Sequence, residues 1–293
     1  MMRPEIFFAI ALSLVGAIAL LFLIYLFLIR TRKAGEIMKT YRGVNFAHRG
    51  LHGEGKAENS LSAFAAAADA GFGIELDVRL SLDGKLVVFH DDTLTRVAGI
   101  DKRVDELAFA ELKKCRLSNT DDTVPSFREV IELIDGRVPL LIEIKEDAGK
   151  SDVTEELVRE LADYAGPYIV ESFNPLSLKT FRKLRRDVPL GILSQHFCRK
   201  EEYRGKILYF ILQNMLLNFL SVPDFVAYEH TDAAMPSLKL ARKVFGTPAV
   251  AWTVRSEEDE RVAISAGFDS IIFENYTPTD GRASDRSLPK YVN

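Results

Sequence analysis

Two carboxylates in one short segment mark the part of the chain where chemistry is expected. Glu75 and Asp77 stand in the run ELDVRL, and side chains two positions apart in a strand point the same way. We expect both to point into a barrel while Ile74, Leu76 and Val78 pack outward against helices. Two buried carboxylates are strongly unfavourable without a cation or hydrogen bonds. The pair therefore predicts a bound cation.

A third carboxylate is expected from a later strand. In the segment LLIEIKE, Glu143 and Lys145 share one face of an otherwise apolar strand, so Glu143 is predicted to join Glu75 and Asp77. An oxygen-rich set without thiolates suits one hard divalent cation, Mg²⁺ or Ca²⁺, better than zinc. Glu143 and Lys145 also have a plainer interpretation as a buried ion pair.

Two histidines are the candidate acid and base. His48 precedes Arg49 and Gly50 at the end of the first expected strand, and catalytic groups of β/α barrels come from the C-terminal ends of strands. Arg49 offers a bidentate contact to phosphate oxygens, and Gly50 lets the backbone approach a ligand. A single histidine is more often structural, so the prediction depends on both histidines lying beside the carboxylates.

The second histidine, His90, is expected to return on a hairpin. Asp83-Gly84 is a strong signal for a two-residue turn, and that turn would place His90 opposite Asp77 on the same face of the sheet. A three-residue or bulged turn would shift the pairing by one residue. His90 would then reach the site only through local distortion.

The elements that would position these residues alternate along the chain. From Gly43 onward, apolar β-rich runs are separated by amphipathic stretches, as in repeated βα units. The eight expected strands are Val44–Arg49, Gly73–Arg79, Pro139–Lys145, Tyr168–Phe173, Leu190–His196, Phe225–His230, Ala249–Val254 and Ser270–Asn275. Expected helices are Leu61–Ala70, Val104–Cys115, Ser126–Ile134, Glu155–Tyr164, Leu176–Arg186, Ser237–Val244 and Glu257–Ala266. The pattern predicts an α/β fold, a (β/α)8 TIM barrel over residues 43–279.

Two stretches carry more specific expectations. Ser60 is a predicted N-cap for the first of these helices, and Gly71 a residue that ends it with positive φ. The stretch Lys206–Ser221 has more apolar residues than one barrel-facing stripe requires. A buried barrel helix is the favoured interpretation. A helix lying in a membrane interface, with Asn214 and Asn218 toward water, is the alternative.

The chain begins with a long apolar run. Residues 7–29 contain no charge and exceed the roughly 20 residues that span a bilayer, which predicts a transmembrane helix. A cleaved signal peptide is the competing interpretation, but its apolar region is shorter and ends at small residues. Residues 30–42 are an expected basic linker, and residues 280–293 a polar tail. The basic side tends to stay in the cytoplasm, so a single-pass protein with a cytoplasmic catalytic domain is predicted.

Composition narrows the classes further. The 293 residues carry a net charge of −4, which argues against a nucleic-acid partner because no global basic surface is present. Only Cys115 and Cys198 occur, without metal-ligand or redox spacing. Both are expected to be ordinary thiols.

The motifs together resemble the glycerophosphodiester phosphodiesterase family. HRG at His48, ENS at Glu58, ELD at Glu75, DG, HD at His90 and EIK at Glu143 occur in the family's order over about residues 43–278. The resemblance implies His48 and His90 as acid/base pair, and Glu75, Asp77 and Glu143 as metal ligands. It further implies phosphate contacts by Arg49 and Lys145, support by Glu58 and a glycerol pocket lined by Trp252. Ala57 and the run Glu274-Asn275-Tyr276-Thr277-Pro278 depart from the family's pattern.

The resemblance implies hydrolysis of a glycerophosphodiester to an alcohol and glycerol 3-phosphate. No large extra domain fits between His90 and Glu143, so we expect an open mouth that admits longer substrates. A lysophospholipase D-like cleavage of lysolipids is therefore a second candidate, with the lipid bilayer as partner of the N-terminal helix. A catalytically silent membrane-anchored binding protein is the third.

Overall fold

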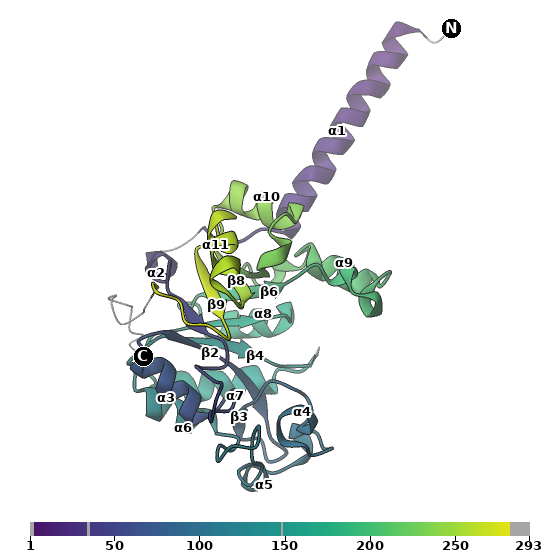
Figure 1. The fold of residues 1–293 in the computed structure, drawn as a ribbon. Coiled ribbons are helices and arrows are strands. Elements are labelled where there is room, and N and C mark those ends of the chain that lie inside the picture. The colour runs from purple at the N-terminus through teal and green to yellow at the C-terminus, as the bar shows by residue number, and fades with distance from the viewer. Residues whose placement is uncertain (1–2, 34–35, 148, 282–293) are drawn as a thin grey trace.

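A closed barrel forms the body of the protein. The computed structural model describes residues 3–33, 36–147 and 149–281. The barrel strands are β1 (Phe46–Ala47), β2 (Gly73–Leu80), β4 (Leu140–Ile144), β5 (Tyr168–Ser172), β6 (Leu190–Ser194), β7 (Phe225–Glu229), β8 (Ala249–Val254) and β9 (Ser270–Phe273). All pair in parallel, and β1 pairs with both β2 and β9, which closes the ring. The predicted TIM barrel is confirmed (Figure 1).

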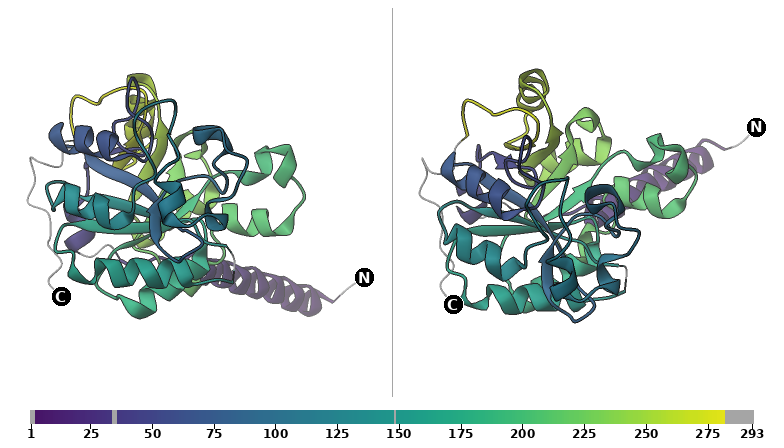
Figure 2. Two further views of the ribbon diagram at one scale, coloured as in Figure 1. Left: turned by 90° about the horizontal axis from the view of Figure 1, so that it is seen from below. Right: turned by 60° about the horizontal axis from the view of Figure 1, so that its bottom comes forward.

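Helices surround the ring (Figures 1 and 2). The longer ones after the first strand are α3 (Leu61–Asp69), α6 (Phe127–Ile134), α7 (Asp152–Glu160), α8 (Pro175–Leu184), α10 (Pro236–Phe245) and α11 (Glu257–Ser265). Short elements are α2 (Glu36–Thr40), α4 (Thr95–Ala98), α5 (Phe109–Leu112), α9 (Ile207–Gln213) and the 3-10 turns Val104–Glu106, Leu161–Asp163, Phe197–Arg199, Glu201–Tyr203, Asn218–Leu220 and His230–Asp232. The predicted cap is confirmed: Ser60 accepts a hydrogen bond from the Ala63 amide, and Gly71 has φ 79°.

Alternation along each strand separates two cores. Ile74, Leu76 and Val78 face the helices, where they pack with Phe64 and Phe127. The opposite faces of the strands fill the inside of the barrel, as Leu141 and Phe225 do. Because the period of a strand is two, the residues between the outward ones must point inward. Glu75 and Asp77 are therefore placed inside the ring by the same alternation.

The segment before the barrel packs against it. Met38 and Tyr41, on and after α2, are buried with Leu141 and Phe225 in the interior core. Ahead of them, the Thr31 hydroxyl lies 2.6 Å from the Thr247 hydroxyl in a hydrogen bond. Apolar side chains thus fill the part of the barrel interior that the charged residues do not occupy.

The hairpin after β2 differs from the predicted register. β2 pairs with β3 (Leu86–Val88) as Val78 to Val88, and the Phe89 amide donates to the Asp77 carbonyl over 3.0 Å. The expected pairing of His90 with Asp77 is wrong by one residue. Gly84 has φ 73° and closes a three-residue loop between Ser81 and Lys85, which is the bulged alternative to a two-residue turn. His90 stands beyond the end of β3, in the loop.

The helix expected over Val104–Cys115 is also wrong as a single element. A 3-10 turn at Val104–Glu106 is followed by α5 at Phe109–Leu112, with Leu107 in extended conformation between them. Glu106 and Glu111 each accept a hydrogen bond from the backbone amide three residues earlier. These side-chain bonds begin two separate short helices because they satisfy amides that one continuous helix would pair internally.

Helix α1 (Pro4–Leu28) extends away from the barrel (Figures 1 and 2). Its stretch Phe8–Leu28 has a mean hydropathy of 2.7 and none of it is buried, so it is long and apolar enough to cross a membrane. A signal sequence passes the same test. At its base the Phe27 ring lies 5.7 Å from the Phe219 ring, centroid to centroid. Of the expected polar tail, residues 282–293 lie outside the described part of the chain.

The stretch Lys206–Ser221 is not one buried helix. It divides into α9 and the turn Asn218–Leu220, with Met215 at φ 55° between them. In the second half Met215, Asn218 and Ser221 are buried, and the Asn218 side-chain amide donates to the Ile29 carbonyl over 3.4 Å. The first half exposes Ile207, Leu208 and Phe210, which are 72%, 53% and 50% accessible. The favoured core interpretation is therefore wrong for α9.

Candidate active site

A cavity of about 180 Å³ lies where the barrel strands end. Its lining comes from seven strands or the residues directly after them: His48, Arg49, Glu75, His90, Glu143, Lys145, Glu171, Phe173, Leu193, Trp252, Thr253, Arg255 and Ile272. Every site residue expected from the sequence lines this cavity except Asp77, which is fully buried and ion-paired to Lys145. Tertiary structure thus brings the predicted set together.

Three of the carboxylates form one cluster. Asp77 and Glu143 are Cα partners on the neighbouring strands β2 and β4. Glu75 stands two residues before Asp77 on β2, so its side chain points the same way. An oxygen of each carboxylate lies within 4.8 Å of the others. All three side chains are buried. Parallel register alone accounts for the meeting, because paired residues of adjacent strands point the same way.

Burial and mutual repulsion disturb the ionisation of the cluster. Burial raises the pKa of Glu75 well above its usual range, and the neighbouring Asp77 and Glu143 add to it. Burial likewise raises the pKa of Glu143 to about 7. Burial also works against ionisation of Asp77, but the positive charges of Lys145 and Arg49, together with His90 whenever that ring is protonated, outweigh it and hold the pKa of Asp77 well below its usual range. The positive charges around the cluster are therefore too few for all three carboxylates to be ionised at once.

The two predicted phosphate contacts are held by acids. Lys145 Nζ lies 2.7 Å from Glu143 Oε1 and 3.2 Å from Asp77 Oδ1. The Arg49 guanidinium donates to Glu58 over 2.7 Å, and its Nε lies 3.5 Å from Asp77. Glu58 therefore supports the site as the resemblance implied, by fixing Arg49. Arg49 itself has φ 56° and donates its amide to Glu75 over 2.9 Å.

Both histidines are buried enough to lose their charge. Burial lowers the pKa of His48 and of His90 below the ordinary value of 6.5. The neutral imidazole is therefore the main form of each at pH 7. A neutral ring accepts a proton at one nitrogen and carries one at the other.

A chain of ion pairs connects the loops of the two histidines. His90 Nδ1 lies 2.6 Å from Asp91, and Arg96 donates to both Asp91 and Glu58 over 2.7 Å. Glu58 also holds Arg49, the neighbour of His48. Sequence reasoning missed Arg96, because nothing in its local pattern indicates that α4 carries it to both acids. The chain orients His90 and Arg49 together.

Two further residues of the site were missed. Asn59 donates from its amide to Asp77 over 2.8 Å with φ 54° in its own backbone. Glu171 is the Cα partner of Glu143 on β5, is buried, and burial raises its pKa well above the usual range. Its signal was present: in YIVES an acid interrupts an apolar strand, as Glu143 does in LLIEI.

The remaining wall of the cavity is apolar. The rings of Trp252 and Phe173 meet edge to face with centroids 5.5 Å apart, and Leu193 and Ile272 lie beside them in the lining. A polar substrate group would meet the acids and bases on one side and a hydrocarbon surface on the other. Trp252 therefore lines the same cavity as the histidines and carboxylates, and its expected role in a glycerol pocket stays a prediction.

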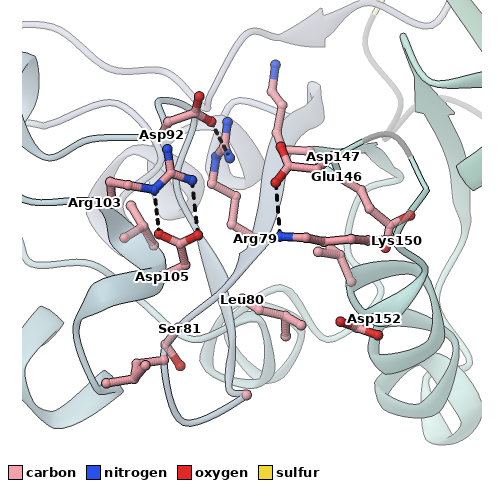
Figure 3. Close-up of a pocket in the computed structure, with 15 residues that line it drawn as sticks. Arg79, Leu80, Ser81, Asp92, Arg103, Asp105, Glu146, Asp147, Lys150 and Asp152 are labelled. Atoms are coloured by element: carbon pink, nitrogen blue, oxygen red, sulfur yellow. Dashed lines mark hydrogen bonds and ion pairs between the residues drawn. The ribbon is translucent and has the colours of Figure 1, made fainter.

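A second cavity of about 460 Å³ adjoins this site through Lys145. Figure 3 shows three ion pairs around it, which join Arg79 to Asp92, Arg103 to Asp105 and Lys150 to Asp147 at 2.7 to 3.0 Å. Each of these three lining cations is therefore compensated by a neighbouring acid. In the smaller cavity, by contrast, the three clustered carboxylates share Lys145 and Arg49 as their partners, which marks this cavity as the candidate active site.

The closed ring places the chain in the β/α-barrel class, whose enzymes carry their active sites at the C-terminal ends of the strands, where this chain gathers its polar residues. Comparison with known proteins identifies the kind of enzyme. Residues 48–277 match the model of the glycerophosphoryl diester phosphodiesterase family, and the chain belongs to that family. Its members are phosphoric diester hydrolases, and so is this chain.

Individual proteins agree with this assignment. A glycerophosphodiester phosphodiesterase of Caldanaerobacter subterraneus subsp. tengcongensis is 30% identical over 78% of this chain and 93% of its own. The structure of an Oleispira antarctica phosphodiesterase in complex with sn-glycerol-3-phosphate superimposes with a TM-score of 0.66 at 22% identity, over 80% of this chain and 94% of the other. A human lysophospholipase D is 31% identical over 34% of this chain and 36% of its own.

Proposed function

We propose that the protein hydrolyses glycerophosphodiesters to an alcohol and glycerol 3-phosphate by acid/base catalysis with His48 and His90. One observation carries the proposal: two half-buried imidazoles, Glu75 and Glu143 border a single small cavity, and Asp77 is buried directly beside these two carboxylates. The product bound to the Oleispira antarctica enzyme, named as sn-glycerol-3-phosphate, supports the same substrate class. Membership of a hydrolase family argues against the catalytically silent binding protein.

We propose that Glu75, Asp77 and Glu143 hold one divalent cation, Mg²⁺ or Ca²⁺. The donor set fits, because its oxygens lie within 4.8 Å of one another and Asp77 Oδ1 makes no hydrogen bond among the described residues. Carboxylate oxygens are the ligands that hard cations prefer. When bound, the cation would neutralise phosphate charge and polarise a phosphoryl oxygen.

The protein's own residues would complete the reaction. One imidazole takes the proton of the attacking hydroxyl, either water or the neighbouring glycerol hydroxyl by way of a cyclic phosphate. The other gives a proton to the leaving alcohol oxygen. Arg49 and Lys145 would bind phosphate oxygens from the edge of the cavity, and Trp252 would cover the glycerol carbons. A lowered pKa favours the accepting role, because a neutral ring is ready to take a proton, whereas the ring that donates must first be protonated.

The test is hydrolysis of glycerophosphocholine by the full-length protein in detergent. Activity should require Mg²⁺ or Ca²⁺ and disappear with a chelator of divalent cations. His48→Ala and His90→Ala should each be inactive, whereas the matched control His196→Ala, outside the cavity, should keep its rate. Full activity in the presence of the chelator would show that the carboxylate cluster is misassigned.

We further propose that α1 anchors the protein in a membrane with the barrel in the cytoplasm. Support comes from the apolar stretch Phe8–Leu28, none of which is buried, and from Arg30, Arg32 and Lys33 shortly after it. A reporter fused to the C-terminus should be active in the cytoplasm. Reporter activity only outside the membrane would reverse the orientation, and loss of α1 from the mature protein would identify a signal peptide.

Cleavage of lysolipids is the second candidate function, and α9 favours it. Three apolar side chains of α9, those of Ile207, Leu208 and Phe210, are at least half exposed, and α9 projects on the side from which α1 leaves (Figures 1 and 2). Such a surface beside a membrane anchor suits contact with lipid. The name of the human relative, a lysophospholipase D, points to the same class.

A paired assay separates the two functions. Lysophosphatidylcholine in vesicles and soluble glycerophosphocholine are offered to the full chain and to Phe210→Ser. We expect the variant to lose several-fold in turnover of the vesicle substrate and to keep its rate on the soluble one. Absence of any lysolipid cleavage by the unaltered protein would remove the second candidate.

A further inference from the structure

A second group of potential metal ligands lies beside the proposed acid/base residue. His48 ends β1, His52 stands four residues later, and Glu274 directly follows β9. β1 and β9 are neighbours in the barrel, with Ala47 opposite Phe273, so His48 and Glu274 leave the sheet side by side. One donor atom of each lies within 4.8 Å of the others.

The two imidazoles face different oxygens of one carboxylate. His48 Nδ1 lies 3.5 Å from Glu274 Oε2, and His52 Nε2 lies 3.4 Å from Glu274 Oε1. Both nitrogens are buried, yet within the described residues neither makes a hydrogen bond of acceptable geometry. Arg255 donates to Glu274 over 3.0 Å and holds the carboxylate in place. Buried polar atoms without partners are rare and call for an explanation.

The two nitrogen–oxygen separations, each to a different oxygen of Glu274, are compatible with ligands around a small tetrahedral ion. Two donors bonded to zinc at roughly 2.0–2.1 Å stand about 3.3–3.4 Å apart at the tetrahedral angle. The observed separations of 3.5 and 3.4 Å are close to this value. Two imidazoles and one carboxylate are moreover a donor set typical of zinc and ill suited to Mg²⁺ or Ca²⁺.

We propose that His48, His52 and Glu274 form an inhibitory zinc site, separate from the carboxylate cluster. A cavity of about 650 Å³ lined by His52 and Glu274 opens beside them and provides an entry path and room for a water as the fourth ligand. The site shares only His48 with the proposed catalytic set.

Inhibition follows from the chemistry of imidazole. A ring that binds zinc through Nδ1 is neutral and carries its remaining proton on Nε2. His48 so bound has no free nitrogen to accept the proton of the attacking hydroxyl. Any proton on Nδ1 is released to solvent when zinc binds. Zinc would thus stop catalysis without displacing the hard cation.

The first experiment measures binding without activity. The full chain in detergent, with saturating Mg²⁺, is titrated with Co²⁺ as a spectroscopic substitute for zinc. Visible absorption typical of a tetrahedral ion should appear with one equivalent. His52→Ala should weaken it at least about tenfold, since even partners of metal ligands are worth that much. His196→Ala is the matched control, and Glu143→Gln should retain the band.

The second experiment measures inhibition and rests on the proposed role of His48. Zn²⁺ is titrated into the glycerophosphocholine assay at saturating Mg²⁺. The rate of each variant is expressed as a fraction of its own rate without zinc. The half-inhibitory zinc concentration should rise at least about tenfold in His52→Ala. Equal sensitivity of both proteins, or absence of the cobalt band, would overturn the proposed site. A band without inhibition would keep the metal site and refute the inhibitory role.

Discussion

The mouth of the barrel holds two clusters of ligand atoms that differ in origin. Glu75, Asp77 and Glu143 lie within strands and are buried. The other cluster, His48, His52 and Glu274, stands just past strand ends and is partly exposed, with side-chain accessibilities of 15–17%. Strand register positions the first cluster, whereas two loops must meet to form the second. The difference teaches that the two clusters have different donor chemistry: carboxylates alone suit a hard cation, whereas two imidazoles and a carboxylate suit a softer one.

The largest loss of activity is expected from replacing the two histidines that would move protons, of which only His48 also belongs to the second cluster. His48→Ala or His90→Ala should lower kcat for glycerophosphocholine by roughly 10²–10⁴-fold, which is the usual contribution of a positioned acid or base. Steady-state kinetics at saturating Mg²⁺ measures this. A loss confined to KM would assign the histidines to binding instead.

The next effect concerns the acidic cluster alone. In Glu143→Gln the cation should bind weakly or not at all, and the melting temperature should no longer rise on addition of Mg²⁺ or Ca²⁺. For the unaltered protein, a cation at 100 times its dissociation constant stabilises the fold by about 2.7 kcal/mol. Thermal unfolding with and without cation measures the difference. An undiminished shift in the variant would locate the cation elsewhere.

A smaller effect should come from the ion-pair chain that orients both sides of the mouth. Arg96 joins Asp91 to Glu58, and these acids hold His90 and Arg49. Arg96→Met should lower kcat by about tenfold, because small misplacement of catalytic groups is costly. Arg96→Lys should restore part of it as the conservative variant. Unchanged kinetics in Arg96→Met would show that these ion pairs do not orient the catalytic groups.

The smallest effect is a shift in pH dependence. Burial lowers the pKa of His48, while contact with Glu274 raises it and so opposes burial. With His48 taken as the proton-accepting ring of the proposed pair, it must be unprotonated, so activity falls as the pH drops through its pKa. In Glu274→Gln the opposing influence is lost and the pKa should fall further. The acid limb of kcat/KM should therefore move to lower pH, and a move upward would contradict the assigned contact.

Much of the site was predictable because its causes are local. Alternation along β2 and β4 indicated Glu75, Asp77 and Glu143 as inward acids, and all three meet in the structure. The same reasoning applied to YIVES would have found Glu171. The hairpin register was not predictable from Asp83-Gly84, since that pair serves both two- and three-residue loops.

The sequence by itself determined the barrel, the inward acids and a long apolar helix at its start, because strand alternation, helix capping and hydropathy act over a few residues. Only the tertiary structure decided that Glu274 would stand between His48 and His52, that Arg96 would join Asp91 to Glu58, and that α9 would be exposed. The first outcome depends on ring closure between β1 and β9, which brings loops far apart in the chain together. The other two depend on how α4 and α9 pack on the barrel, which no local pattern encodes.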